Sequence, residues 1–212
     1  MMRRITDISV ALVTLLLLSP VFVLTIIAVV VTSPGNPFYG GWRAGKDGVR
    51  FRMWKFRTMV KGADRMGGAI TTQRDPRVTA VGHFLRATKI DELPQFFNLL
   101  AGDLTIVGPR PEDPNIADRY TPEQNETLKV KPGITGPGQL YYTTHQASTV
   151  PEGANAEEYY IEHLLGPKLR IDLEYLRRRT AWSDCGVVLE TIAVMFRALT
   201  NALRSEASAN AL

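Results

Sequence analysis

Two adjacent acidic residues, Asp91 and Glu92, have the chemistry and the setting of a reactive site. The apolar residues that follow recur at the spacing of one buried helix face: Leu93, Phe96, Phe97 and Leu100. Pro94 fits only the first turn of a helix, so the two carboxylates stand at or just before the helix start, where the dipole favours negative charge. We expect Asp91 to be ionised at neutral pH and able to act as a nucleophile or a metal ligand. The alternative is that Asp91 is an ordinary N-cap.

Basic residues at four points of the chain suggest what such a carboxylate would meet. Lys55 and Arg57 alternate along a predicted strand over residues 49–59 and therefore share one face. Arg86 precedes Asp91 by one and a half helical turns, and Arg110 lies between Pro109 and Pro111, which restrict its backbone. Guanidinium groups bind phosphate through two parallel hydrogen bonds, so the set predicts a diphosphate site. The alternative for the basic run over 43–52 is a solvated surface that faces lipid headgroups.

The N-terminal part of the chain is a membrane segment with a break at its centre. No charged residue occurs between Asp7 and Arg43, and a single helix over 8–31 would reach roughly 36 Å, enough for a bilayer core of about 30 Å. Ser19-Pro20 interrupts it, because proline removes a backbone donor and clashes with the preceding turn. Two arrangements follow: a kinked helix that crosses the membrane once, or a re-entrant helix–break–helix. Basic residues on both sides of the segment favour re-entry.

Composition excludes several other classes of protein. The chain has 212 residues, 45% of them hydrophobic, with a net charge of +4 and one cysteine. A disulfide scaffold and a C-x-x-C metal site are excluded, as is a polytopic membrane protein, because no second apolar segment exists. The charge suits an anionic partner but is small for a nucleic-acid binder, and no recognition motif for nucleic acid is present.

The remaining pattern predicts a mixture of short elements. We expect a bulge near Trp54 in the strand over 49–59, a second strand over 104–107, and no regular structure over 131–138. Helices are predicted over 78–89, 88–101, 157–165, 168–179 and 183–203, with Gly166-Pro167 stopping one of them. The expected organisation is a membrane segment over 1–33, a catalytic domain over 34–203 and a frayed tail over 204–212.

Four features in order resemble one protein family. They are the Ser19-Pro20 break, Lys55-Phe56-Arg57-Thr58-Met59, Asp91-Glu92-Leu93-Pro94-Gln95 and Gly108-Pro109-Arg110-Pro111, followed by Val130-Lys131-Pro132-Gly133-Ile134-Thr135-Gly136. Together they resemble the bacterial sugar transferases in their small form, the monotopic phosphoglycosyl transferases. The resemblance covers roughly residues 3–140.

The resemblance implies a fold, a reaction and a set of site residues. The fold is a compact α/β domain with amphipathic helices in the membrane interface. A nucleoside-diphosphate sugar, usually a UDP-sugar, gives its sugar-1-phosphate to polyprenyl phosphate at the cytoplasmic face of the bacterial inner membrane, an early step of glycoconjugate or exopolysaccharide assembly. The resemblance assigns Asp91 as the nucleophile and Glu92 as its acidic partner, and it implies that both bind Mg²⁺. The residues assigned to substrate are Lys55, Arg57, Arg86, Gln95, Pro109, Arg110 and Pro111, the last three near the uridine.

Two points remain open at the level of sequence. After Gly136 the chain reads Pro137-Gly138-Gln139-Leu140-Tyr141-Tyr142-Thr143, which departs from many family members, so the sugar is not implied. The competing function is a single-pass, non-catalytic membrane adaptor with a basic anion-binding face, in which Asp91 and Glu92 only cap a helix.

Overall fold

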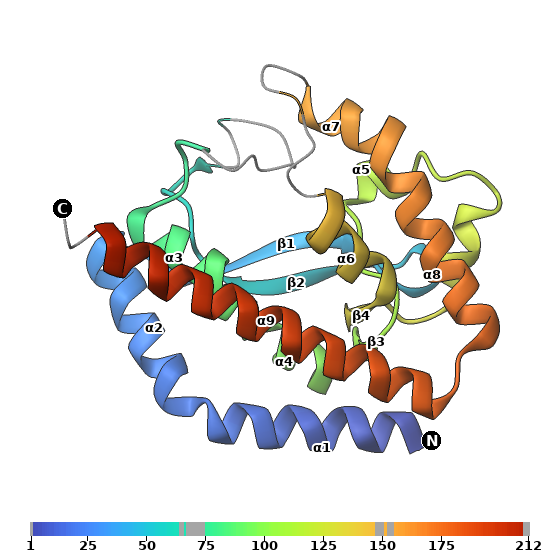
Figure 1. Cartoon of the computed structure of the whole chain (residues 1–212), viewed down its shortest axis with the longest axis horizontal. Helices are drawn as coiled ribbons and strands as arrows, with labels where there is room; N and C mark the ends of the chain where they lie inside the picture. The colour runs from blue at the N-terminus through green and yellow to red at the C-terminus, as the bar shows by residue number, and fades with distance from the viewer. Residues whose placement is uncertain (1, 64–65, 67–74, 147–150, 152–154, 210–212) are drawn as a thin grey trace.

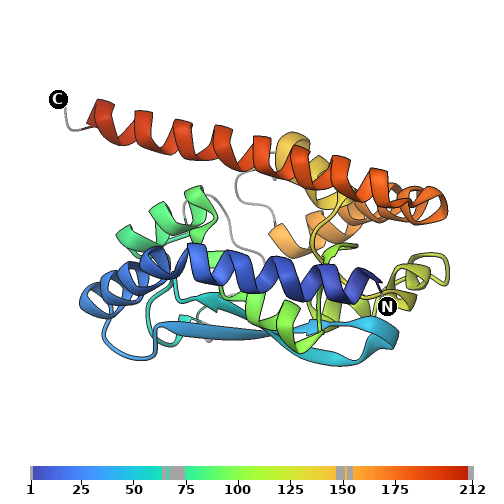
Figure 2. The same cartoon turned by 90° about the horizontal axis from the view of Figure 1, so that it is seen from below.

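The computed structural model describes residues 2–63, 66, 75–146, 151 and 155–209. A β-hairpin runs through the middle of the molecule, and helices surround it (Figure 1). Seen from below, the hairpin and the long last helix lie on opposite sides, with other helices between them (Figure 2). The result is a mixed helix-and-strand domain, predominantly helical, with two small separate sheets.

The hairpin pairs β1 (Phe38–Ala44) with β2 (Arg50–Phe56), antiparallel, from Phe38 opposite Phe56 to Ala44 opposite Arg50. This pairing is one-for-one, so the bulge expected near Trp54 is wrong. The alternation shifts because helices cover both faces of β2. Phe51 and Met53 pack against one group of helices, and Phe56 packs on the opposite face.

The N-terminal segment consists of α1 (Met2–Leu17) and α2 (Ser19–Thr32), bent by 64° where the sequence predicts a break. The Ser19 hydroxyl donates to the Leu16 carbonyl at 2.8 Å, which satisfies a group that the bend exposes. Among the described residues no single helix is long and apolar enough to cross a membrane. Ala11 and Val29 bury one side of the pair against the domain, whereas Leu16 and Leu17 near the bend are about three-quarters exposed.

A helix, a single turn and a second helix carry the acidic pair. The elements are α3 (Ala80–Thr88), the 3₁₀ turn η3 (Ile90–Glu92) and α4 (Gln95–Ala101), which confirms the helices predicted here. Lys89 takes the left-handed conformation (φ 61°) and separates α3 from η3. Gly102 ends α4 with φ 92°, a conformation that glycine adopts without strain.

A second sheet pairs β3 (Thr105–Val107) with β4 (Gly133–Thr135) in parallel, so the prediction of irregular structure over 131–138 is wrong. The glycines there permit close approach rather than breaking the strand: a Cβ on Gly133 would lie 2.2 Å from the Gly108 nitrogen. The other short elements between residues 108 and 146 are α5 (Pro114–Ala117), the 3₁₀ helix η4 (Gln124–Lys129), α6 (Pro137–Tyr141) and the π-helix η5 (Tyr142–Gln146).

The C-terminal helices also correct the sequence analysis. α7 (Ala156–Tyr159) continues through the π-helical η6 (Tyr160–Leu165) into α8 (Gly166–Arg178), so Gly166-Pro167 does not stop the helix. The wider π-turn relaxes the bonding that proline would disrupt, and Leu164, Leu165 and Leu169 bury this stretch. α9 (Ala181–Ala209) continues past the predicted end at Leu203; residues 210–212 of the predicted tail lie outside the described residues.

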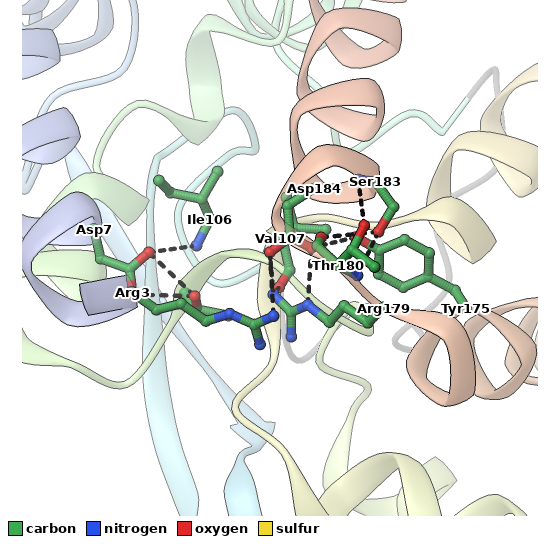
Figure 3. Close-up of polar contacts among 10 residues, drawn as sticks. Arg3, Asp7, Ile106, Val107, Tyr175, Arg179, Thr180, Ser183 and Asp184 are labelled. Carbon is green, nitrogen blue, oxygen red and sulfur yellow. Dashed lines mark hydrogen bonds and ion pairs between the residues drawn. The ribbon is translucent and has the colours of Figure 1, made fainter. Parts of the chain in front are cut away.

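Helix side chains satisfy the free edge of each small sheet. The Asn98 amide of α4 accepts from Trp54 N at 2.9 Å and donates to the Arg52 carbonyl at 2.7 Å on β2. Asp7 of α1 does the same for β3, accepting from Ile106 N at 3.1 Å (Figure 3). On the other side of β3, Arg179 bonds both the Val107 carbonyl and Asp184 of α9. These contacts bind helices to strands that lack a third partner.

Truncating Asn98 tests how much one such edge contact contributes. Asn98→Ala leaves the Trp54 N–H and the Arg52 carbonyl without partners, so we expect the free energy of unfolding to fall by about 1–3 kcal/mol. Thermal and denaturant unfolding in detergent micelles measure the change. Asn115→Ala, at an exposed position, is the matched control and should be neutral. Equal stability of the two variants would show that water replaces the Asn98 contacts at no cost.

Candidate functional site

One cavity of about 690 Å³ collects the charged residues that the sequence analysis selected. It lies where the end of β2, the α3–η3 junction, the loop after β3 and the C-terminal helices meet. All of the ionisable residues predicted for the site line it: Lys55, Arg57, Arg86, Asp91, Glu92 and Arg110. The structure therefore brings together residues that are up to 55 positions apart in the chain.

Asp91 is buried and chemically available. Its side chain is 7% exposed, Oδ2 lies 3.9 Å from Lys55 Nζ, and Oδ1 has no hydrogen-bond partner. It does not cap α4, because Pro94 holds the N-cap position and no side chain caps that helix. The N-cap interpretation of Asp91 is therefore wrong, and the carboxylate is left free on the cavity wall.

Glu92 is the opposite case, because cations occupy both of its oxygens. Oε1 accepts from Lys55 Nζ at 2.9 Å and from Arg110 at 2.7 Å, and Oε2 accepts from the second Arg110 nitrogen at 3.3 Å. Burial alone would raise the pKa of Glu92, but Arg110, Lys55 and Lys89 hold it well below its usual value. Glu92 is thus a fixed anion that orients two basic side chains.

The same burial acts differently on Asp91. Loss of hydration raises the pKa of Asp91, and the charge of Glu92 raises it further, although Lys55, Lys89 and Arg86 oppose the change. This direction is opposite to the one a helix-start argument predicts, because α4 begins only at Gln95, beyond Asp91. Burial is also the main cause that lowers the pKa of Lys55. Two adjacent carboxylates therefore have their pKa values pushed apart, a pattern typical of functional sites.

The other two arginines predicted for the site, Arg57 and Arg86, have different partners. Arg86 donates from Nε to the Thr58 hydroxyl at 2.8 Å. Arg57 donates to the Ser33 carbonyl at the end of α2, while its buried Nε has no partner. Arg57 therefore links the cavity to the exit of the membrane segment as well as lining it.

Three predicted residues do not line the cavity. Gln95 is fully buried on α4 and neither atom of its amide has a partner. Pro109 and Pro111 are buried on either side of Arg110, so they position the arginine. Direct contact of these three residues with substrate stays a prediction.

The C-terminal third of the chain forms one end of the cavity, which the sequence did not predict. Glu112, Lys168 and Tyr160 form a hydrogen-bonded group there, and Gln139 and Tyr142 complete the wall. The only local signal was the polar-aromatic stretch at Tyr141-Tyr142. Nothing in a helical pattern marks Lys168 as buried rather than solvated.

A divalent cation at this site would depend on Asp91. No group of three metal-ligating side chains occurs among the described residues, and both Glu92 oxygens already bind cations. Asp91 has a free oxygen of the hard type that Mg²⁺ prefers, and Mg²⁺ commonly uses one or two carboxylates together with substrate phosphates. The residues present fit such an ion.

Comparisons with known proteins show the family of the chain. The family model described as bacterial sugar transferase matches residues 1–198. The UDP-glucose:undecaprenyl-phosphate glucose-1-phosphate transferase of Escherichia coli (strain K12) is 37% identical over 195 residues, which are 91% of this chain and 39% of the relative.

Two further relatives extend the comparison. The Caulobacter vibrioides UDP-glucose:undecaprenyl-phosphate glucose-1-phosphate transferase is 33% identical over 193 residues, 90% of this chain and 68% of the relative. The UDP-N-acetylgalactosamine-undecaprenyl-phosphate N-acetylgalactosaminephosphotransferase of Aeromonas hydrophila is also 33% identical, over 90% of this chain and 42% of the relative. The chain thus spans about two fifths of the Escherichia coli and Aeromonas proteins. With the family model matching nearly all of it, the chain belongs to the bacterial sugar transferase family.

Proposed function

We propose that this protein transfers sugar-1-phosphate from a UDP-sugar to polyprenyl phosphate, giving polyprenyl-diphosphate-sugar and UMP. The observation that carries the proposal is Asp91, a buried carboxylate with a free oxygen in a cavity lined by Lys55, Arg86 and Arg110. The activities for which the relatives are named support the reaction type, and their different sugars leave the sugar open.

The proposed chemistry proceeds in two steps at Asp91. A carboxylate oxygen attacks the sugar-proximal phosphorus, the bond to the bridging oxygen breaks, and UMP leaves with that oxygen. An oxygen of polyprenyl phosphate then attacks the phosphoaspartate, and the bond to Asp91 breaks, which restores the carboxylate. Because the two substrates react in turn, a soluble nucleotide and a long lipid can use the same carboxylate.

The surrounding cations suit this sequence of steps. Lys55 and Arg110, held by Glu92, present fixed positive charge where the diphosphate must lie, so little reorganisation is needed as charge develops. Asp91 must be deprotonated to attack, and the basic groups around it favour that form against burial. We propose Mg²⁺ as the cofactor, bound by Asp91 with phosphate oxygens and with Glu92 nearby; when bound, it would offset diphosphate charge.

The proposed location is the membrane interface, with α1 and α2 re-entrant and the domain on the cytoplasmic face. Contacts at both ends of the pair support re-entry. Arg4 near the start of α1 donates to the Leu99 and Leu100 carbonyls of α4, and Ser33 after α2 accepts from Arg57. A single crossing would separate these ends by about 30 Å of hydrocarbon. The polyprenyl acceptor and membrane lipids are the partners that this arrangement predicts.

Asp91→Asn tests the nucleophile. The amide keeps the shape and removes a buried charge, so the fold should survive, but it cannot form the phosphoaspartate and turnover should fall to background. In wild-type protein given UDP-sugar and Mg²⁺ without acceptor, we expect UMP release no greater than the protein concentration and sugar-phosphate retained on a peptide containing Asp91. Radiolabelled donor and peptide mass spectrometry measure both.

An exposed carboxylate provides the control for Asp91→Asn. Asp118→Asn, at an exposed carboxylate in a surface ion pair, should retain full activity. If UMP appears only when polyprenyl phosphate is present and no labelled peptide is trapped, transfer is direct and Asp91 is not the nucleophile.

Arg110→Ala tests the phosphate and nucleotide contact. Loss of a charged hydrogen bond costs about 1.5–3 kcal/mol, so kcat/KM for the UDP-sugar should fall about tenfold to a hundredfold. Arg110→Lys should recover part of the loss, because it restores charge without the two-pronged geometry. Repeating Arg110→Ala in a Glu92→Gln background separates direct contact from orientation through Glu92. Unchanged kinetics in folded protein would assign Arg110 a structural role.

Cysteine labelling in intact cells tests the topology. With Cys185→Ser as background, Met2→Cys and Ser205→Cys should both be protected from an impermeant reagent added outside. Replacing Ser19 and Pro20 together with Ala removes the break and should favour a crossing helix, so residue 2 becomes reactive. External labelling at residue 2 in the chain with the break intact would exclude re-entry.

A further inference from the structure

The far end of the cavity holds a polar group that the proposed steps at Asp91 do not use. Glu112 follows Pro111 in the loop after β3, and Lys168 lies in the first turn of α8. Lys168 Nζ donates to Glu112 Oε1, the Tyr160 hydroxyl donates to the same oxygen at 2.6 Å, and Lys168 also donates to the Tyr160 oxygen at 2.9 Å. All three residues line the cavity.

The arrangement leaves one carboxylate oxygen of Glu112 available. Both bonds within the described part of the chain converge on Oε1, and Oε2 accepts none. Oε2 is not fully buried, so it is accessible from the cavity. Gln139 lines the same wall, but its side-chain oxygen is buried and does not face the cavity.

The group is rigid before any ligand arrives. The Tyr160 ring packs in a core with Ile116, Leu164 and Leu169, and the Tyr142 ring meets it edge-on with centroids 5.6 Å apart. Burial alone would raise the pKa of Glu112, but Lys168 and Tyr160 hold it below its usual value. Glu112 is therefore an ionised, acceptor-only group in a fixed position.

This chemistry selects a neutral ligand with hydroxyl donors. The free carboxylate oxygen of Glu112 repels phosphate, which the cations around Asp91 attract instead. A carboxylate acceptor beside a lysine ammonium matches adjacent hydroxyl groups, which both donate and accept. Arg110 lies between the two ends of the cavity, because the negative charges of Glu92, Glu112 and Asp91 all stabilise its guanidinium and raise its pKa.

We infer that Glu112, oriented by Lys168 and Tyr160, binds a vicinal diol of the nucleotide-sugar donor. The inference rests on the proposed function and adds a specificity-determining residue to it. A UDP-sugar offers such a diol in two places, the ribose and the hexose, and the chemistry at Glu112 is the same for both.

Donor analogues with single hydroxyls removed distinguish the two sources. In wild-type protein we expect kcat/KM to fall at least tenfold for one class only: the 2′-deoxyribose donor, or one of the 2-, 3- and 4-deoxyhexose donors. Glu112→Gln should lose at least tenfold with the complete donor, mainly through KM, and less than twofold with the analogue that lacks the contacted hydroxyl. Glu158→Gln, an exposed carboxylate on α7, should match wild type with every donor.

The contrary results separate this inference from the proposed function. Equal losses of Glu112→Gln on every donor, or no loss on any, would overturn diol binding and leave a structural ion pair. If Glu112→Gln does not fold, the wild-type series decides, and less than twofold change for every deoxy donor overturns the inference. If wild-type protein turns over no UDP-sugar, the proposed function fails. The inference is then tested by calorimetric binding of UDP-glucose and its deoxy analogues, with the same comparison of affinities between donors. Absence of binding would overturn the inference.

Discussion

Seven buried charges along the cavity wall alternate in sign, and this constraint organises the rest of the structure. Removing an ion from water costs several kcal/mol unless a partner offsets it, so the charges alternate along the wall. Followed from one ionic neighbour to the next, the order is Arg86, Asp91, Lys55, Glu92, Arg110, Glu112 and Lys168. These residues come from α3, η3, β2, the loop after β3, and α8. The alternation exists only because the fold holds these five separate segments in fixed positions around the cavity.

The alternation explains why two neighbouring carboxylates behave differently. Glu92 lies between two cations and spends both oxygens on them, whereas Asp91 has one lysine at 3.9 Å and no hydrogen bond. Glu92 therefore serves as a counter-ion that places Lys55 and Arg110, and Asp91 keeps an oxygen without a partner, as the proposed nucleophile requires. A pair in which both carboxylates were saturated would be stable but inert.

Local patterns predicted the elements near Asp91 well, and predicted long-range contacts poorly. The apolar spacing after Asp91 found α4, and alternation found β2, because each signal lies within one element. Glu112 and Lys168 are 56 positions apart, and nothing in either segment marks them as partners. Glycine and proline misled the analysis at residues 131–138 and at Gly166-Pro167. There, close packing of Gly133 on Gly108 and a π-turn before Pro167 override the usual role of these residues as breakers.

The membrane segment and the site share their supports. Arg4 holds the end of α4, the helix that follows Glu92, and Asp7 holds β3, the strand that precedes Arg110. Arg4 is thus engaged with helix carbonyls, so it contributes less to topology as a free positive charge than its sequence position indicates. Beyond Asp7, α1 extends about 15 Å to the bend, and α2 returns about 20 Å. Neither length alone crosses a hydrocarbon core of roughly 30 Å, as the proposed re-entrant arrangement requires. The contacts of Arg4 and Asp7 thus fix the bend relative to the cavity, and in the proposed re-entrant arrangement they hold Asp91 at the height where a headgroup phosphate and a soluble nucleotide would meet.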